Sequence, residues 1–265
     1  MDDGNFTIRP IMSGMENTGL LSGKTAVVTG GAVNIGRAIS LELASAGARV
    51  WIGWNVHEEA AEALQTAIGE TGGDAFSAKI DVSEEASVKT FFRGVKETSE
   101  NVDILVNNAG VFSLTPQASL SAEEWDRLFA INSRGLFLAS REGAAMMNEG
   151  GAIVNLASIN ALHPGFGNTA HYDATKGAVV AYTRSLAAEL APAGIRVNAI
   201  APGLVDSEGL RRDAADLAAM VEERTPLKKL ATGKDVGQLA VFLSSGAASH
   251  ITGQTVVVDG GYLLT

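Results

Sequence analysis

The sequence predicts an α/β protein with one doubly wound domain, in which a seven-stranded parallel sheet is covered by helices on both faces. Short apolar runs rich in β-branched residues alternate along the chain with longer stretches of helical period. The runs are apolar throughout, which is typical of strands buried on both faces of a parallel sheet. With 265 residues, 46% of them hydrophobic, and no linker-like stretch, a single domain is expected.

Seven runs are expected to be strands, at 25–29, 48–53, 75–80, 102–107, 151–156, 195–200 and 255–259. The stretches between and after them are expected to be helices, near 35–46, 57–70, 84–98, 121–148, 172–192, 207–224 and 233–245. Ser83 and Ser121 each precede a pair of glutamates, which predicts that both serines cap a helix. Because crossovers between parallel strands are right-handed, a ligand crevice is expected at the carboxyl ends of the strands.

The composition excludes several classes of partner and site. A formal charge of -10 without any Lys/Arg cluster argues against a nucleic-acid or anionic-membrane surface. No cysteine is present, and no His/Asp/Glu grouping has metal-ligand spacing, so we expect no catalytic metal. Residues 1–21 lack the apolar stretch of a signal peptide and are expected to be a mobile tail or a subunit contact before a domain at 22–265. A cytoplasmic protein is the expectation.

The stretch TGGAVNIG at 29–36 follows the first strand and opens the first helix. Small residues let a backbone approach a phosphate closely, and the free N–H groups of a helix start attract the negative charge. Asparagine replaces glycine best where a positive φ is needed. We therefore expect a dinucleotide phosphate loop in which Asn34 keeps the turn, with Gly30, Ile35 and Gly36 as the other contacts.

The ends of the next strands carry further candidate cofactor contacts. The second strand ends in Trp54 and Asn55, where neither an acid for a ribose 2′-hydroxyl nor a cation for a 2′-phosphate is found. Arg37 is either a phosphate contact or a solvated surface charge, so the choice between NAD(H) and NADP(H) stays open here. Small or polar residues at the third and fourth strand ends are the remaining candidates: Asp81, Val82, Asn108, Ala109 and Gly110.

An acid–base pair is expected near the fifth strand. Ser158 follows that strand, and fourteen positions later Tyr172 opens a helix that also contains Lys176. Positions i and i+4 share a helical face, so the ammonium and the phenol can meet at one ligand. A phenol has a pKa near 10, and a nearby cation must lower it by roughly two to three units, or about 3 to 4 kcal/mol, before it exchanges protons readily at neutral pH.

Seven stretches in one order resemble the short-chain dehydrogenases/reductases, over essentially all of residues 22–263. They are TGGAVNIG, NNAG (107–110), Ile131-Asn132, Ala157-Ser158, YDATK (172–176), IRVNAIAPG (195–203) and ITGQTVVVDGG (251–261). The resemblance implies a seven-stranded Rossmann fold and an NAD(P)-dependent oxidoreductase that interconverts a carbonyl and a secondary alcohol. It also implies a homotetramer.

The resemblance implies a role for each matching residue. Tyr172 is then the catalytic acid/base, Lys176 lowers its pKa and binds the nicotinamide ribose, Ser158 hydrogen-bonds the substrate oxygen, and Asn132 belongs to a proton relay. The segment beside the nicotinamide would contribute Pro202, Gly203, Val205 and Ser207.

Departures from the family pattern bear on the cofactor. Asn34 replaces the usual middle glycine, and Val33 replaces the arginine that many NADP(H)-dependent members carry. Against this, the acid-free end of the second strand, with Trp54, resembles that of many NADP(H)-dependent ketoacyl reductases. The balance favours NADP(H) over NAD(H).

The interval between Ser158 and Tyr172 is one residue longer than is common, and it borders the substrate. Asn160, His163 and Phe166 are candidate pocket residues, although each also fits an ordinary loop, turn or core role. His171 faces another side of the helix and is expected to be structural. Residues 204–228 are expected to form a mobile lid, a plain surface excursion being the alternative.

Two substrate classes remain open from the sequence, a 3-oxoacyl thioester and a sugar, polyol or other alcohol. The missing basic patch for a carrier protein favours a small free substrate. A dinucleotide-binding regulator without turnover is the alternative from another functional class.

Overall fold

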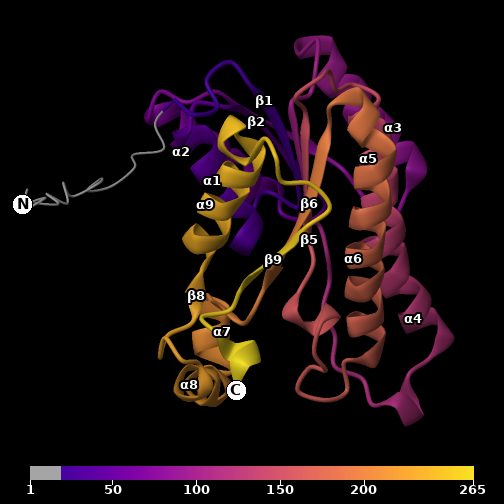
Figure 1. The fold of residues 1–265 in the computed structure, drawn as a ribbon, viewed down its shortest axis with the longest axis vertical. Coiled ribbons are helices and arrows are strands. Elements are labelled where there is room, and N and C mark those ends of the chain that lie inside the picture. Colours follow the sequence, from indigo (N-terminus) through magenta and orange to yellow (C-terminus); the bar gives the residue numbers. More distant parts are fainter. Residues whose placement is uncertain (1–18) are drawn as a thin grey trace, which may run out of the picture.

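The computed structural model describes residues 19–265 and contains the predicted parallel sheet (Figure 1). Its strands are β1 (Thr25–Thr29), β2 (Arg49–Trp54), β3 (Ala75–Lys79), β4 (Ile104–Asn107), β5 (Ala152–Leu156), β6 (Arg196–Pro202) and β9 (Thr255–Val258). All pairs are parallel, and the order across the sheet is β3-β2-β1-β4-β5-β6-β9. The doubly wound Rossmann fold is therefore confirmed.

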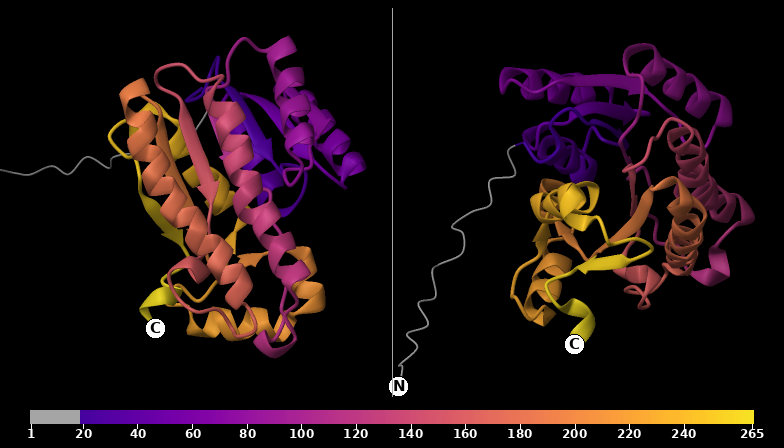
Figure 2. Two further views of the ribbon diagram at one scale, coloured as in Figure 1. Left: turned by 90° about the vertical axis from the view of Figure 1, so that its right-hand side faces the viewer. Right: turned by 45° about the horizontal axis from the view of Figure 1, so that its top comes forward.

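Helices cover both faces of the sheet, as the views in Figures 1 and 2 show. One layer holds α1 (Asn34–Ser45), α2 (Glu58–Glu70) and α9 (Gly233–Ser244). The other holds α3 (Glu85–Thr98), α4 (Ala122–Phe129), α5 (Leu136–Ala144) and α6 (Ala170–Leu190). The apolar strands are buried between these layers in two large side-chain clusters, one on each face of the sheet.

Two of the expected helices are interrupted. The predicted helix 121–148 is α4 and α5 joined by a π-helical turn at Ala130–Gly135. Inside that turn, the side chain of Asn132 bonds the backbone of Val111 in both directions, and this long-range contact accompanies the change of helical period. The predicted helix 207–224 is split into α7 (Glu208–Asp213) and α8 (Ala215–Arg224), since Ala214 has the non-helical angles φ -148° and ψ 47°.

A short parallel pair that the sequence did not predict precedes and follows these two helices. It is formed by β7 (Val205–Asp206) and β8 (Ala231–Thr232). Figure 1 shows α7, α8 and the C-terminus together at one end of the molecule. The segment 204–228 is therefore pinned at both ends beside the carboxyl edge of the sheet.

One of the two expected serine caps is present. The Ser121 hydroxyl accepts a hydrogen bond from the Glu124 N–H at 3.2 Å, so that prediction is confirmed. The prediction for Ser83 is wrong. Helix α3 begins one residue later, after Glu84, and the Ser83 hydroxyl donates to Asp81 at 2.6 Å because that carboxylate lies closer than the helix start.

The expected tail at 1–21 falls mostly outside the described residues, which begin at 19. Leu21 already belongs to the core, being 1% exposed, and its N–H donates to the Ala46 carbonyl at 2.8 Å. Packed structure thus begins just before the predicted domain start. None of the helices formed by residues 19–265 is long and apolar enough to cross a membrane.

Candidate active site

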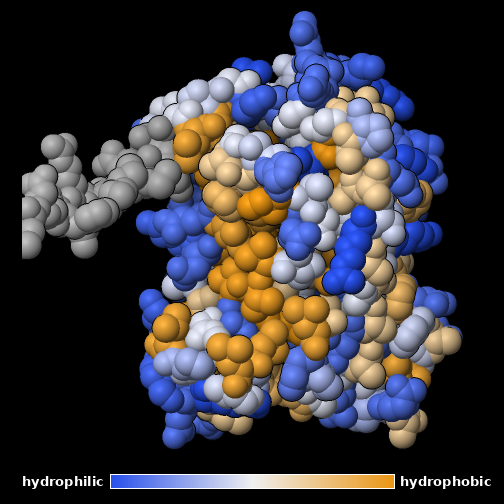
Figure 3. All heavy atoms as spheres, viewed as in Figure 1, coloured by the Kyte–Doolittle hydropathy of each residue, from blue (hydrophilic) through white to orange (hydrophobic). Residues whose placement is uncertain are grey.

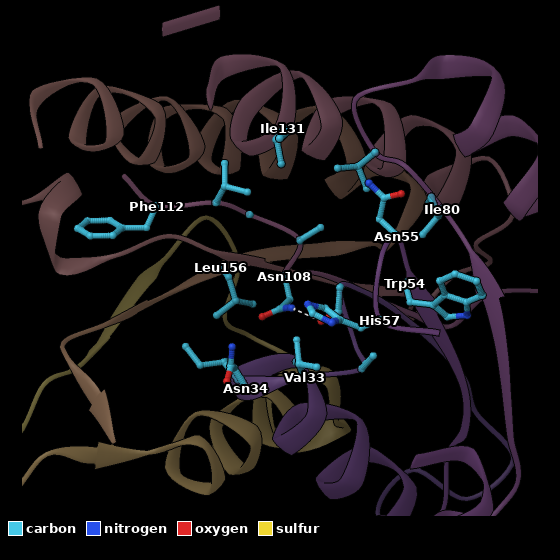
Figure 4. Close-up of a pocket in the computed structure, with 18 of the residues that line it drawn as sticks. Val33, Asn34, Trp54, Asn55, His57, Ile80, Asn108, Phe112, Ile131 and Leu156 are labelled. Atoms are coloured by element: carbon cyan, nitrogen blue, oxygen red, sulfur yellow. Dashed lines mark hydrogen bonds between the residues drawn. The ribbon is translucent and has the colours of Figure 1, made fainter. Parts of the chain in front are cut away.

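A cleft of about 560 Å³ opens at the carboxyl ends of the strands, where the topology predicts it. Figure 4 shows Trp54, Asn55 and Ile80 at one end, Phe112 at the other, and the first glycine loop between them. Fourteen of the expected residues line it: Gly30, Asn34, Ile35, Gly36, Trp54, Asn55, Asp81, Val82, Asn108, Ala109, Gly110, Tyr172, Lys176 and Pro202.

The first loop has the backbone that a close approach of a phosphate requires. Asn34 has φ 49° and Gly30 has φ 62°, so the expected positive φ at Asn34 is confirmed. A Cβ on Gly36 would overlap the carbonyl oxygen of Gly30 and lie 2.5 Å from Nδ2 of Asn108. Glycine is thus required at position 36 by the protein itself, and the bare backbone leaves room for a ligand at the start of α1.

The fourth strand end supports this loop from across the cleft. Asn108 Nδ2 donates to the carbonyl oxygens of Thr29 at 3.1 Å and Gly30 at 2.8 Å. In return, Thr29 Oγ1 accepts from the N–H groups of Asn108 and Ala109, both at 3.1 Å. The side chain of Asn108 is therefore engaged by the protein, while the backbone of the segment lines the cleft.

At the Trp54 end, an amide and a carboxylate from two strand ends are joined. Asp81 accepts hydrogen bonds from the Ser83 N–H and hydroxyl at 2.9 and 2.6 Å, and from Asn55 Nδ2 at 3.2 Å. Burial alone would raise the pKa of Asp81, but these hydrogen bonds outweigh it and lower the pKa. The Lys79 ammonium lies over the Trp54 ring, 5.9 Å from its centroid. Arg37 is exposed and does not line the cleft.

Tyr172 and Lys176 both reach the cleft from the first turns of α6. Lys176 is 6% exposed, its Nζ donates to the Leu156 carbonyl at 2.7 Å, and it lies 5.7 Å from the centroid of the Tyr172 ring. Burial lowers the pKa of Lys176 to about 8. Burial also raises the pKa of Tyr172 to about 12, while the neighbouring Ser158 side chain acts in the opposite direction. Proton exchange at neutral pH therefore needs a further positive charge beside the phenol.

The side chains of Asn132 and Lys176 converge on the backbone of Gly110. Asn132 is 1% exposed, and its Oδ1 lies 3.2 Å from the place that a Cβ on Gly110 would take. The Lys176 Nζ lies 3.6 Å from the same place. The lack of a side chain at position 110 thus keeps open a small polar space between the amide and the ammonium.

Of the five residues expected to contact the substrate, only Tyr172 lines the cleft; Ser158, Asn160, His163 and Phe166 do not. Asn160 Nδ2 donates to Asp173 at 2.7 Å, and Asp173 also accepts from Thr169 at 3.0 Å, so these side chains tie the loop to the start of α6. His163 Nδ1 lies 2.7 Å from the Pro164 carbonyl oxygen. Phe166 packs on Tyr262, with ring centroids 6.2 Å apart.

The segment expected beside the nicotinamide is only partly at the cleft. Pro202 lines it, whereas Gly203 packs closely against Asp259, and Val205 lies in β7. The Ser207 hydroxyl accepts from the Leu210 N–H at 3.2 Å and caps α7.

Helix α7 is fastened to both of its neighbours. Arg211 in α7 bonds Asp206 of β7 at 2.6 and 3.0 Å and Glu222 of α8 at 2.6 and 3.2 Å. One guanidinium thus links three elements of the segment 204–228, which was expected to be a lid.

Sequence reasoning missed eleven lining residues, most of them chain neighbours of predicted ones: Ala32, Val33, Val56, His57, Ile80, Ser83, Val111, Phe112, Ile131, Leu156 and Ala157. Phe112 is 55% exposed, and its ring meets the edge of Tyr172 at a centroid distance of 4.9 Å. An aromatic side chain two residues after the NNAG stretch (107–110) is the signal that could have identified it.

The cleft suits a dinucleotide. Its middle is a glycine-rich helix start without side chains in the way, and its two ends carry an indole and a phenol–ammonium pair. Within residues 19–265, no group of three or more His, Asp or Glu side chains is arranged to hold a metal ion. The glycine loop and the phenol–ammonium pair fit an organic cofactor, with phosphates at the loop and a reactive ring near Tyr172.

The chain is similar to known oxidoreductases over most of its length. The family profile described as enoyl-(acyl carrier protein) reductase matches residues 30–263. The 3-oxoacyl-[acyl-carrier-protein] reductase FabG of Staphylococcus epidermidis is 36% identical over 242 residues, covering 90% of this chain and 98% of that protein. The uncharacterized oxidoreductase YxbG of Bacillus subtilis is 35% identical, covering 92% and 93%.

Solved structures give the same result. A short-chain dehydrogenase/reductase from Serratia marcescens superposes with a TM-score of 0.88 at 36% identity, covering 91% of this chain and 98% of that one. A putative gluconate dehydrogenase from Agrobacterium tumefaciens superposes with a TM-score of 0.86 at 33% identity, covering 94% and 99%. The chain belongs to the short-chain dehydrogenase/reductase family, in its 3-oxoacyl-reductase-like branch, and is an NAD(P)-dependent oxidoreductase.

Proposed function

We propose that this protein interconverts a carbonyl and a secondary alcohol by hydride transfer, with Tyr172 as the general acid/base. The observation that carries the proposal is the position of the phenol. Tyr172 and Lys176 line the same cleft as the glycine loop. The Tyr172 ring packs on Phe112, which lies at the end of the cleft away from Trp54 (Figure 4). A cofactor with its phosphates at the loop would extend its reactive ring toward the phenol.

In this mechanism, Tyr172 and Ser158 act on the same substrate oxygen. The Tyr172 hydroxyl gives its proton to the carbonyl oxygen during reduction and takes it back during oxidation. The Ser158 hydroxyl donates a hydrogen bond to the same oxygen, where negative charge develops. When bound, the nicotinamide supplies or accepts the hydride. Lys176 holds the ribose and stabilises the phenolate, and Asn132 helps to return the proton from solvent.

We propose NADP(H) as the preferred cofactor. Residues 54–57 at the end of β2 carry no carboxylate that would repel a 2′-phosphate, and the Lys79 ammonium lies close to the Trp54 ring. Fluorescence titration with NADPH and NADH in parallel tests this preference. A lower dissociation constant for NADH would overturn it.

The reaction is tested by following NADPH and NADH oxidation over a panel of carbonyl compounds. Tyr172→Phe removes only the hydroxyl, so turnover should fall by about 10² to 10⁴ while the cofactor dissociation constant stays the same. Near-normal turnover by Tyr172→Phe would refute the assignment. A wild-type protein that binds cofactor but reduces nothing would favour the dinucleotide-binding regulator.

For the substrate, we propose a small free carbonyl compound over a carrier-bound thioester. No basic patch for an acidic carrier is evident in the sequence, whose net charge is -10. Relatives point both ways, since one is named as a reductase of 3-oxoacyl-[acyl-carrier-protein] and another as a putative gluconate dehydrogenase. The panel should therefore contain a 3-oxoacyl thioester, a sugar acid and simple ketones, and the largest kcat/KM decides between the classes.

We further propose a cytoplasmic homotetramer. Figure 3 shows an apolar band that runs over α9 and β9, and Phe242 on α9 is 40% exposed. The strand β9 is also the last of the sheet and pairs on one side only. An exposed apolar face next to an open strand edge fits contact with a second subunit. Light scattering that gives a monomer at working concentration would refute this assembly.

A further inference from the structure

Residues 111–115, which run past the phenol, alternate between inward and outward side chains. The inward residues are Val111, Ser113 and Thr115, and the outward ones are Phe112 and Leu114, which are 55% and 61% exposed. Each inward residue is hydrogen-bonded: Val111 to Asn132, Ser113 to His171 and Glu124, and the Thr115 N–H to the Asn168 carbonyl. A period of two is that of an extended chain, in which successive side chains point to opposite sides. The hydrogen bonds at positions 111, 113 and 115 therefore fix the direction of the Phe112 side chain.

The direction of the hydrogen bonds at Ser113 follows from the charge of Glu124. Two bonds from Arg127, at 2.7 and 2.9 Å, and one from Ser113 lower the pKa of Glu124 to about 2. The carboxylate is therefore ionised at neutral pH and can only accept. The Ser113 hydroxyl donates to it at 2.7 Å, and the Ser113 oxygen is left to accept from His171 Nε2 at 2.8 Å.

His171 directly precedes Tyr172 in the first turn of α6 and is fully buried. With the proton on Nε2, its Nδ1 is the bare nitrogen, and that atom is buried without a hydrogen-bond partner. One residue along, the Phe112 and Tyr172 rings meet edge to face, at 4.9 Å and 84°. Adjacent residues of the segment thus contact adjacent residues of the helix, which fixes both the position and the orientation of the phenol.

We propose that His171 and Ser113 are positioning residues for Tyr172. The hydrogen-bonded chain from buried His171 through Ser113 to Glu124 holds Phe112 against the phenol ring, so that the hydroxyl keeps its direction toward the substrate oxygen. The inference rests on the function proposed above. Neither residue lines the cleft, so their loss should affect turnover and leave cofactor binding unchanged.

The variants Ser113→Ala, His171→Phe and the double variant test the chain kinetically. Each should lower kcat per folded site by about tenfold to a hundredfold, with an unchanged cofactor dissociation constant. The double variant should be no worse than the worse single one, because both break the same chain. His171→Gln retains an N–H donor and should recover part of the lost rate.

Ser119→Ala is the matched control. It removes an exposed hydroxyl that donates to the Pro116 carbonyl at 3.2 Å, in the same connection and outside the chain. Its kcat should equal that of the wild type. If Ser113→Ala and His171→Phe lower only the melting temperature and keep wild-type kcat per folded site, both residues are merely structural and the proposal is overturned. Additive effects in the double variant would also overturn it.

A second measurement does not depend on activity. Proton–nitrogen NMR of nitrogen-labelled histidine resolves the tautomer of each of the four histidines, and the His171 variants assign its signal. We expect a slowly exchanging Nε2–H on His171 that loses its protection in Ser113→Ala. A proton on Nδ1 instead would overturn the chain. A wild type with this signal but without turnover on any carbonyl would instead contradict the proposed function.

Discussion

The backbone of the glycine loop predicts what replacing Asn34 will do. Its φ of 49° lies in the left-handed region, which costs an ordinary L-residue about 1 to 2 kcal/mol. Asparagine tolerates this region better than most residues, and glycine adopts it freely. Asn34→Ala therefore carries the full strain, whereas Asn34→Gly loses the amide and keeps the turn. The difference between the two variants isolates the contribution of the backbone.

The strain can appear in one of two measurements. If the loop stays in place, Asn34→Ala unfolds at a temperature lower than Asn34→Gly, by about 2 to 4 °C per kcal/mol in a domain of this size. If the loop relaxes instead, cofactor binds about 5- to 30-fold more weakly, the factor that 1 to 2 kcal/mol represents. Thermal unfolding and nicotinamide fluorescence titration measure the two quantities. Equal values for both variants in both assays would refute the reasoning.

Three further predictions follow from the same site. Gly36→Ala places a Cβ onto the Gly30 carbonyl oxygen and should abolish cofactor binding; a near-normal titration would contradict this. Asn55→Asp adds a second carboxylate beside Asp81 at the adenosine corner, so NADPH should bind about tenfold more weakly while NADH does not, with Asn55→Ser as the neutral control. For Lys176, burial lowers the pKa from 10.5 to about 8, so the unfolded chain binds more protons between these values and the free energy of unfolding rises with pH across them. Lys176→Met should abolish turnover and remove this rise of the free energy of unfolding with pH. At pH 7 it should increase the free energy of unfolding by up to about 3 kcal/mol, less about 1 kcal/mol for the lost hydrogen bond to the Leu156 carbonyl. Urea unfolding at pH 7, 9 and 10.5 measures the free energy, and the same pH dependence in Lys176→Met and the wild type would contradict the prediction.

The sheet and its cleft could be predicted because their cause is local in the sequence. A strand buried on both faces must be apolar along its whole length, and each predicted run became a strand with ends within two residues. The break between α4 and α5 could not be predicted in this way. It coincides with the bonds between Asn132 and Val111, which lie 21 residues apart, and a helical period alone does not record such a contact.

For the candidate site, sequence reasoning identified segments better than it identified atoms. Asn160 and Asn108 were expected to contact ligands, yet the side chain of one bonds Asp173 and that of the other bonds the glycine loop. A polar residue at a strand end suits either role, and only the geometry tells them apart. Phe112 was missed although it follows a polar stretch, because no local pattern shows that its ring packs on Tyr172, 60 residues further along the chain.

The loop at 29–36 and the segment at 107–110 are best understood as one structural unit. The Asn108 side chain donates to the carbonyl oxygens of Thr29 and Gly30, and the Thr29 hydroxyl oxygen accepts from the N–H groups of Asn108 and Ala109. Each strand end thus holds the backbone of its neighbour. Because these groups satisfy one another, the N–H groups at the start of α1 are left for a ligand. Asn34 adds the last requirement, a left-handed residue that turns the chain into the helix. Segments far apart in the sequence thus supply the support and the surface of the proposed phosphate site, and a Cβ on Gly36 would not fit between them.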